Sequence, residues 1–102
     1  MKLVILDNVE AFIHDFDLKT YTRIRRNLDI LEKSGHNLRM PYSKNILPNI
    51  FELRIIGQDN IRVIYTFSND LIVVFYAFLK KTNQISLKDM RTIRSKYYNL
   101  YL

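Results

Sequence analysis

The sequence predicts a small α+β domain in which helices pack on one face of a short antiparallel sheet. Apolar residues recur with the period of a helix in residues 7–34 and again in residues 86–100. Between these segments lie three runs rich in Ile, Val, Phe and Tyr, separated by short polar turns. With 102 residues, 48% of them hydrophobic, and only two Gly and two Pro, the chain is expected to form one domain over residues 1–102.

The N-terminal half is expected to contain a strand and a helical hairpin. Residues 2–6 form a short apolar run with the β-branched residues that favour a strand. Asp7, three residues before Glu10, is expected to cap a first helix. Asp17 is expected to cap a second, longer helix that ends at Gly35, since glycine readily adopts the left-handed conformation found at helix C-termini. Because few residues separate the two helices, we expect them to form a helical hairpin.

The C-terminal half is expected to form a meander and a final helix. Residues 36–48 show neither period and contain both prolines, which predicts an ordered loop. Three antiparallel strands follow, over residues 50–56, 61–67 and 71–79. The third of these runs is apolar at both parities, as expected of a central strand covered on two sides. Ser86, three residues before Asp89, is expected to cap the last helix.

Composition narrows the class of function. The net charge of +6 and the pI of 9.7 favour a polyanionic partner, above all nucleic acid, or an acidic protein; the alternative is a mildly basic domain whose charge has no function. The absence of Cys excludes a disulfide framework, a thiolate nucleophile and a zinc ribbon. No apolar run is long enough for a membrane span or a signal peptide, so a cytoplasmic protein without membrane contact is expected.

Strand parity indicates a cluster of charges on the sheet. Glu52 and Arg54 alternate with apolar residues in the first strand of the meander, as Arg62 does in the second. Arg54 and Arg62 should therefore emerge close together on one face, where their guanidinium forks suit a phosphate. Lys80 and Lys81 close the third strand and can approach the same region. The alternative is that Arg54 simply pairs with Glu52 on a solvated face.

Four segments resemble the phage-derived HigB-like toxins of the RelE/ParE superfamily: GHNLRMPYSK (35–44), FELR (51–54), RVIY (62–65) and AFLKKT (77–82). They follow the order and spacing of that family and, with the helical hairpin, cover nearly the whole chain. The resemblance implies the RelE-like fold and the toxin of a type II toxin–antitoxin system. Such a toxin is an mRNA endoribonuclease that acts on the ribosome, without metal or cofactor, until its antitoxin silences it.

The resemblance also implies roles for the basic residues. In this family the 2′-hydroxyl of the RNA attacks the adjacent phosphate, and cations stabilise the charge that develops there. The residues that match the family's catalytic basic positions are Arg54, Arg62, Lys80 and Lys81. The candidates for RNA binding are Arg39, Lys44, Arg91 and Arg94, of which the last two are equally suited to an acidic segment of the antitoxin. The antitoxin itself is expected to be a small helix-turn-helix protein encoded next to the toxin.

The sequence departs from the family at the groups that move protons. Several members have Tyr or His at the start of the last helix, whereas residues 82–90 contain neither. The remaining candidates for acid and base are His36, Lys44, Glu52, Tyr97, Tyr98 and Tyr101. All of them except Lys44 have a stated structural alternative: a helix-end contact for His36, an internal ion pair for Glu52, and core or antitoxin contact for the tyrosines. The departure leaves two other functions open, a ParE-like poison of DNA gyrase and a nucleic-acid-binding domain that has lost its activity.

Overall fold

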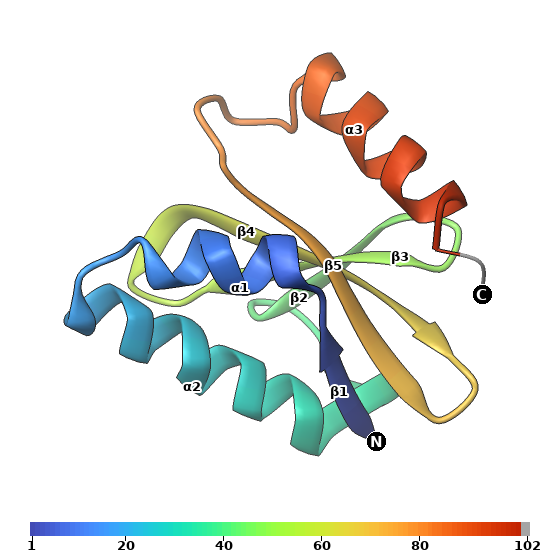
Figure 1. The fold of residues 1–102 in the computed structure, drawn as a ribbon, viewed down its shortest axis with the longest axis horizontal. Coiled ribbons are helices and arrows are strands. Elements are labelled where there is room, and N and C mark those ends of the chain that lie inside the picture. The colour runs from blue at the N-terminus through green and yellow to red at the C-terminus, as the bar shows by residue number, and fades with distance from the viewer. Residues whose placement is uncertain (101–102) are drawn as a thin grey trace.

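Five strands form one mixed sheet in the order β1-β5-β4-β3-β2 (Figure 1). The strands are β1 (Lys2–Ile5), β2 (Ser43–Leu47), β3 (Ile50–Ile55), β4 (Gln58–Ser68) and β5 (Leu71–Leu79). The computed structural model describes residues 1–100, apart from the side chain of Asp59. The predicted meander corresponds to β3, β4 and β5, whose pairings are antiparallel. β1 adds to it in parallel alongside β5.

The helices are α1 (Asp7–His14), α2 (Leu18–Ser34) and α3 (Leu87–Tyr98), with the short 3-10 helix η1 (Gly35–Asn37) after α2. The α+β class is confirmed, but the prediction that all helices pack on one face of the sheet is wrong. The hairpin of α1 and α2 covers one face and α3 covers the other (Figure 1). The reason lies in β5, where Ile72 and Val74 point into the core beneath the hairpin and Val73 and Phe75 into the core beneath α3.

The predicted loop over residues 36–48 contains the edge strand β2, and this part of the prediction is therefore wrong. β2 pairs antiparallel with β3, with Ser43 opposite Leu53 and Lys44 opposite Glu52. Only Ser43 is buried in this strand, so its sequence lacks the alternation of apolar residues that reveals a half-buried strand. Edge strands are often short and charged because these features prevent pairing with other chains.

The helix ends agree with the sequence except at Asp7. Asp7 is the first residue of α1 rather than its cap, a position that Leu6 occupies without a side-chain hydrogen bond. Asp17 and Ser86 each accept a hydrogen bond from a backbone N–H in the first turn of their helices, as predicted. Gly35 ends α2 with a φ of 53°, which also confirms the expectation for that residue. None of the helices within residues 1–100 has both the length and the apolar character of a membrane span.

Candidate functional site

Arg54 and Arg62 lie directly opposite each other on β3 and β4, as strand parity predicted. The connection between the two strands turns at Gly57, whose φ of 89° is a conformation that side chains with a Cβ rarely adopt. A Cβ at this position would also lie 3.2 Å from the guanidinium of Arg23. The register shifts by a bulge just after Arg54, so the paired arginines lie at the last regular position before the turn.

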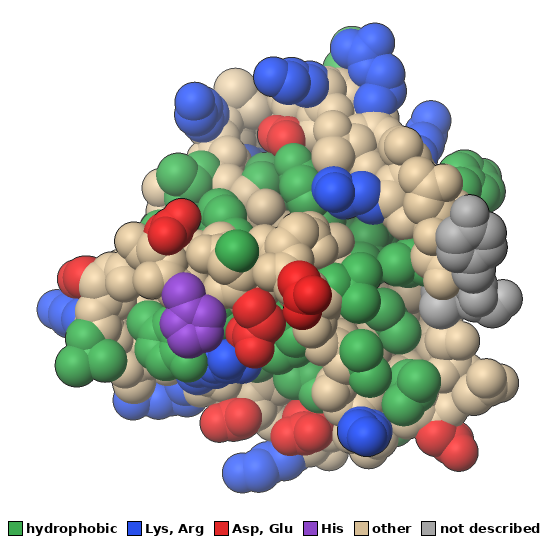
Figure 2. Space-filling view, in the orientation of Figure 1, with side chains coloured by type: hydrophobic (Ala, Val, Ile, Leu, Met, Phe, Trp, Pro, Cys, Tyr) green, Lys and Arg blue, Asp and Glu red, His purple; other side chains and the backbone are tan. Residues whose placement is uncertain are grey.

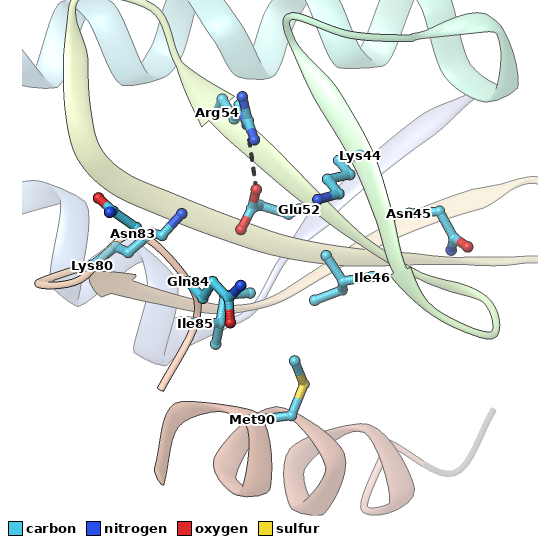
Figure 3. Close-up of a pocket in the computed structure, with 10 residues that line it drawn as sticks. All are labelled: Lys44, Asn45, Ile46, Glu52, Arg54, Lys80, Asn83, Gln84, Ile85 and Met90. Carbon is cyan, nitrogen blue, oxygen red and sulfur yellow. Dashed lines mark hydrogen bonds and ion pairs between the residues drawn. The ribbon is translucent and has the colours of Figure 1, made fainter. Parts of the chain in front are cut away.

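The carboxylate of Glu52 lies between the two arginines. Its Oε1 atom is 3.4 Å from Nε of Arg54, the contact dashed in Figure 3. The same oxygen is 3.5 Å from Nε of Arg62. Glu52 is only 2% exposed and Arg62 only 8%, whereas Arg54 is half-buried. A carboxylate removed from water to this extent depends on its cationic partners. The ion pair between Arg54 and Glu52 is thus present, but on a largely buried face rather than a solvated one.

Lys80 belongs to the same electrostatic environment. Partial burial lowers the pKa of its ammonium group, and the positive charge of Arg62 lowers it further, while Glu52 partly offsets this effect. Arg54 and Lys44 act in the same direction as Arg62. The backbone N–H of Lys80 donates to the carbonyl of Asn60 at 2.6 Å, which holds the end of β5 beside the start of β4. Cations gathered in this way are stabilised when an anion joins them.

A cavity of about 330 Å³ opens beside this cluster, between the sheet and α3 (Figure 3). Its charged part is lined by Lys44, Glu52, Arg54 and Lys80. Its apolar part is lined by Ile46 from β2, Ile85 from the segment before α3 and Met90 from α3. The amide side chains of Asn45, Asn83 and Gln84 complete the wall. The cavity therefore offers cations, one carboxylate, amides and an apolar surface within the length of one small ligand.

Lys81 lies close to this cavity rather than in it. A neighbouring hollow is lined by Arg62, Lys80 and Lys81 together with Asn60, Thr82 and Asn83. Of the predicted catalytic residues, Lys80 lines both hollows, and Lys81 extends the positive surface outward. Lys and Arg side chains also gather over α3 and the segment leading into it, whereas acidic and basic side chains are mixed over the helical hairpin (Figure 2).

Other predicted site residues lie elsewhere. The ring of His36 packs on Phe67 with centroids 3.9 Å apart, and the guanidinium of Arg39 donates to the carbonyl of His36 at 2.6 Å. Phe67 belongs to the core beneath the helical hairpin, so both residues are on the opposite side of the sheet from Glu52. The structure does not bring His36 or Arg39 to the charged cavity.

The C-terminal candidates occupy the far end of α3. Arg94, Tyr97 and Tyr98 line a separate cavity of about 410 Å³ against the turn between β2 and β3. Tyr98 is 79% exposed and lies about 12 Å along the helix from Met90. Arg91 is exposed on α3. Tyr101 lies outside the described residues.

Sequence reasoning missed the part of the cavity that carries no charge. Ile46, Asn83, Gln84, Ile85 and Met90 come from three elements, and no local period connects them. The one available signal is that residues 82–86 contain neither Gly nor Pro, as in an ordered connection rather than a flexible one. Within residues 1–100, no three His, Asp or Glu side chains converge in a way that would hold a metal ion.

The arrangement of a five-stranded sheet, a helical hairpin and a C-terminal helix defines the RelE fold. The crystal structure of the isolated E. coli RelE toxin matches with a TM-score of 0.63 at 8% sequence identity, over 90% of this chain and 97% of that chain. Residues 11–98 match the family described as Phage derived protein Gp49-like (DUF891), and the chain belongs to this family. The predicted membership of the RelE/ParE superfamily is confirmed, while the closer likeness to HigB toxins stays a prediction. No curated protein matches the sequence significantly.

Proposed function

We propose that this protein is the toxin of a type II toxin–antitoxin system and that it cleaves mRNA on the ribosome. The observation that carries the proposal is the cluster of Arg54, Arg62 and Lys80 around the buried carboxylate of Glu52, with Lys44 nearby, at the edge of a cavity. Among the contacts that the structure describes here, four cations gather near one carboxylate, and this excess of positive charge suits the phosphate of an RNA chain. A toxin that only binds a protein has no need of such a clamp.

The cluster supports cleavage by the RNA's own 2′-hydroxyl. The 2′-oxygen forms a bond to phosphorus while the bond from phosphorus to the 5′-oxygen breaks, which leaves a 2′,3′-cyclic phosphate and a 5′-hydroxyl. Arg54 and Arg62, fixed on paired strands, would stabilise the extra negative charge of the phosphorane. Preorganised donors of this kind are worth about 100- to 1000-fold in rate.

The proton transfers are assigned to groups that line the same cavity. Glu52 is the one carboxylate among the described residues that line it, and it is our candidate for the acceptor of the 2′ proton. Lys80 is the candidate donor to the leaving 5′-oxygen, because a lowered pKa makes its ammonium group a stronger acid. His36 and Tyr98 lie away from the cavity and have no part in this proposal.

The proposed partners follow from this function. The substrate is mRNA on the ribosome in the cytoplasm, and the inhibitor is a small helix-turn-helix antitoxin. Lys81, Arg91 and Arg94 are exposed cations outside the cavity, suited to ribosomal RNA or to an acidic segment of the antitoxin.

Controlled expression in bacteria tests the proposal, with translation and the response to DNA breaks followed together. Wild-type protein is expected to stop translation rapidly, with cuts inside translated codons. Arg62→Ala is expected to be harmless, and Arg26→Ala, an exposed change on α2, to be as toxic as the wild type. A DNA-break response with intact mRNA would instead identify a gyrase poison. If neither response appears, the domain has lost its activity and the proposal is wrong.

A further inference from the structure

We infer that Arg23 on α2 is a positioning residue for the proposed cleavage: it holds the turn between β3 and β4 at Gly57, and this turn sets the arginine pair of the cluster. The pair consists of Arg54 and Arg62, which the proposed function assigns to the phosphorane, so the inference rests on that function. Arg23 belongs to the helical hairpin, which packs on the face of the sheet opposite α3.

The side chain of Arg23 lies over the β3–β4 turn. Its Nη1 atom donates a hydrogen bond to the carbonyl of Gly57 at 3.0 Å. The Nη1, Cζ and Nε atoms lie 3.2, 3.3 and 3.4 Å from the point that a Cβ of Gly57 would occupy, so the planar guanidinium lies flat over this glycine. A residue with a Cβ would meet the guanidinium and would also have to adopt a φ of 89°. The contact therefore depends on both partners.

A second bond from α2 supports the same turn. The side-chain amide of Gln58 donates to the hydroxyl of Thr20 at 3.4 Å, three residues before Arg23. Thr20 is buried, and the carbonyl of Arg23 accepts a hydrogen bond from the buried side chain of Asn27 at 2.8 Å. This part of α2 is thus held against the core and provides a fixed base for the turn.

The pairing of the two strands does not by itself fix the turn. Arg54 pairs with Arg62, but the next residue of β3, Ile55, pairs with Gln58. Residues 59–61 of β4 therefore bulge out between the two partners. A bulge bends its strand, increases the local twist and changes the direction of neighbouring side chains. The contacts from α2 lie at the end of this bulge and restrict its shape.

The turn and the bulge adjoin three cations of the cluster. Gly57 lines a hollow of about 290 Å³ together with Arg54 and Arg62. The carbonyl of Asn60, within the bulge, accepts the 2.6 Å hydrogen bond from the backbone of Lys80. A displacement of the turn would therefore change the spacing of these cations. Donors to a transition state act only when they are placed in advance, and a misplacement of about 1 Å can cost about 100-fold in rate.

Single-turnover cleavage of ribosome-bound mRNA tests the inference. Arg23→Ala is expected to lower the rate at saturating protein by about tenfold and to leave the half-saturating concentration unchanged. Gly57→Ala displaces the guanidinium but keeps its charge, so it should also slow cleavage, and the double variant should be no slower than the slower single variant. Arg26→Ala, which removes an exposed arginine from the same helix, is the matched control and should keep the wild-type rate.

The dependence on salt separates positioning from direct contact with RNA. The affinity is measured for ribosome-bound mRNA that carries 2′-deoxyribose at the cut, so that it binds without being cleaved. Arg23→Ala should leave the slope of log affinity against log salt unchanged, because the loss of a phosphate contact reduces this slope by about one. A reduced slope would identify Arg23 as an RNA contact and would overturn the inference, as would a wild-type cleavage rate in this variant.

Nuclear magnetic resonance of the Nε–H groups of Arg54 and Arg62 tests the inference without cleavage. At low ionic strength, Arg23→Ala is expected to shift both signals and to require a several-fold higher sulfate concentration to titrate them, whereas Arg26→Ala should match the wild type. Unchanged signals and titration in folded Arg23→Ala, which circular dichroism checks, would overturn the inference. A wild-type protein that cuts no mRNA, but whose paired arginines respond to Arg23→Ala in this way, would overturn the proposed function alone.

Discussion

Arg54 and Arg62 are paired across β3 and β4, and their Nε atoms approach the same atom, Oε1 of Glu52, at 3.4 and 3.5 Å. One carboxylate thus serves two guanidinium groups, and Lys80 adds a third positive charge. Among the contacts that the structure describes in this cluster, one carboxylate faces three cations, and an additional anion stabilises this arrangement. This relationship leads to predictions for both stability and activity.

Replacing Arg62 by Ala is expected to slow mRNA cleavage on the ribosome by about 100- to 1000-fold, because a fixed donor to the phosphorane is lost. The change also leaves Glu52 with one fewer cation in a buried position, so the free energy of unfolding should fall by about 3 kcal/mol. Single-turnover rates and urea denaturation measure the two effects. Arg62→Lys separates them: it keeps the charge but not the bidentate geometry, so it should recover stability more than activity. A folded Arg62→Lys protein with the wild-type rate would be inconsistent with the proposed role.

Replacing Glu52 by Gln is expected to make the cluster bind anions more strongly, since it removes a negative charge from between Arg54 and Arg62. At low ionic strength the free energy of unfolding should fall by about 3–5 kcal/mol, and sulfate should restore part of the loss. Because sulfate stabilises most proteins, the comparison is between its effect on the variant and on the wild type. Equal stabilisation of both proteins would show that the arginines do not bind the anion. Cleavage should be lost even though RNA binds more tightly, if Glu52 accepts the proton.

Replacing Lys80 by Met is expected to abolish most cleavage without lowering stability at neutral pH. The pKa of Lys80 is lowered in the folded protein, so the unfolded chain binds this proton more tightly. The free energy of unfolding of the wild type should therefore rise with pH between the lowered pKa and 10.5, and this rise should be absent in the variant. Burial raises the pKa of Tyr65 and Tyr76, which lowers stability above pH 10 in both proteins alike. The difference between the two denaturation series isolates Lys80, and a difference independent of pH would disprove the assignment.

Replacing Ser86 by Ala is expected to lower the free energy of unfolding by about 1 kcal/mol, because Ser86 accepts the first hydrogen bond of α3 from the N–H of Asp89 at 3.0 Å. Ser86→Thr should retain most of the cap. Ser95→Ala, an exposed change later in the same helix, is the control and should alter stability by less than about 0.5 kcal/mol. Thermal denaturation compares the three variants, and equal effects of the two alanine substitutions would argue against a capping role.

A strand of the sheet could be predicted where one of its faces is buried, because apolar and polar residues then alternate along the sequence. In β3, alternation assigned Leu53 and Ile55 to the hairpin side and Glu52 and Arg54 to the other side, as observed. β2 escaped prediction because an edge strand with exposed Lys44 has no such alternation. The position of α3 could not be predicted for another reason. The apolar residues of β5 indicate cover on both faces, but not which helix provides it.

The charged half of the site could be predicted and the apolar half could not. The pairing of Arg54 with Arg62 follows from a short hairpin, which is a local feature. The burial of Glu52 depends on how α3 and its preceding segment fold back over the sheet, and no local pattern reports this. Met90 lies on the inner face of a helix, and the sequence pattern alone predicts an ordinary core residue there. Its place in the cavity wall follows only from the packing of distant elements.

The chemical form of the new RNA ends tests the central claim most directly. A 5′-labelled mRNA on purified ribosomes is incubated with wild-type protein or with Arg62→Ala, and the ends of the labelled fragments are identified. Fragments that end in a 2′,3′-cyclic phosphate or a 3′-phosphate, formed by the wild type and at least about 100-fold more slowly by the variant, are the predicted result. Intact mRNA, or fragments that end in a 3′-hydroxyl, would contradict cleavage by the 2′-hydroxyl at this cluster.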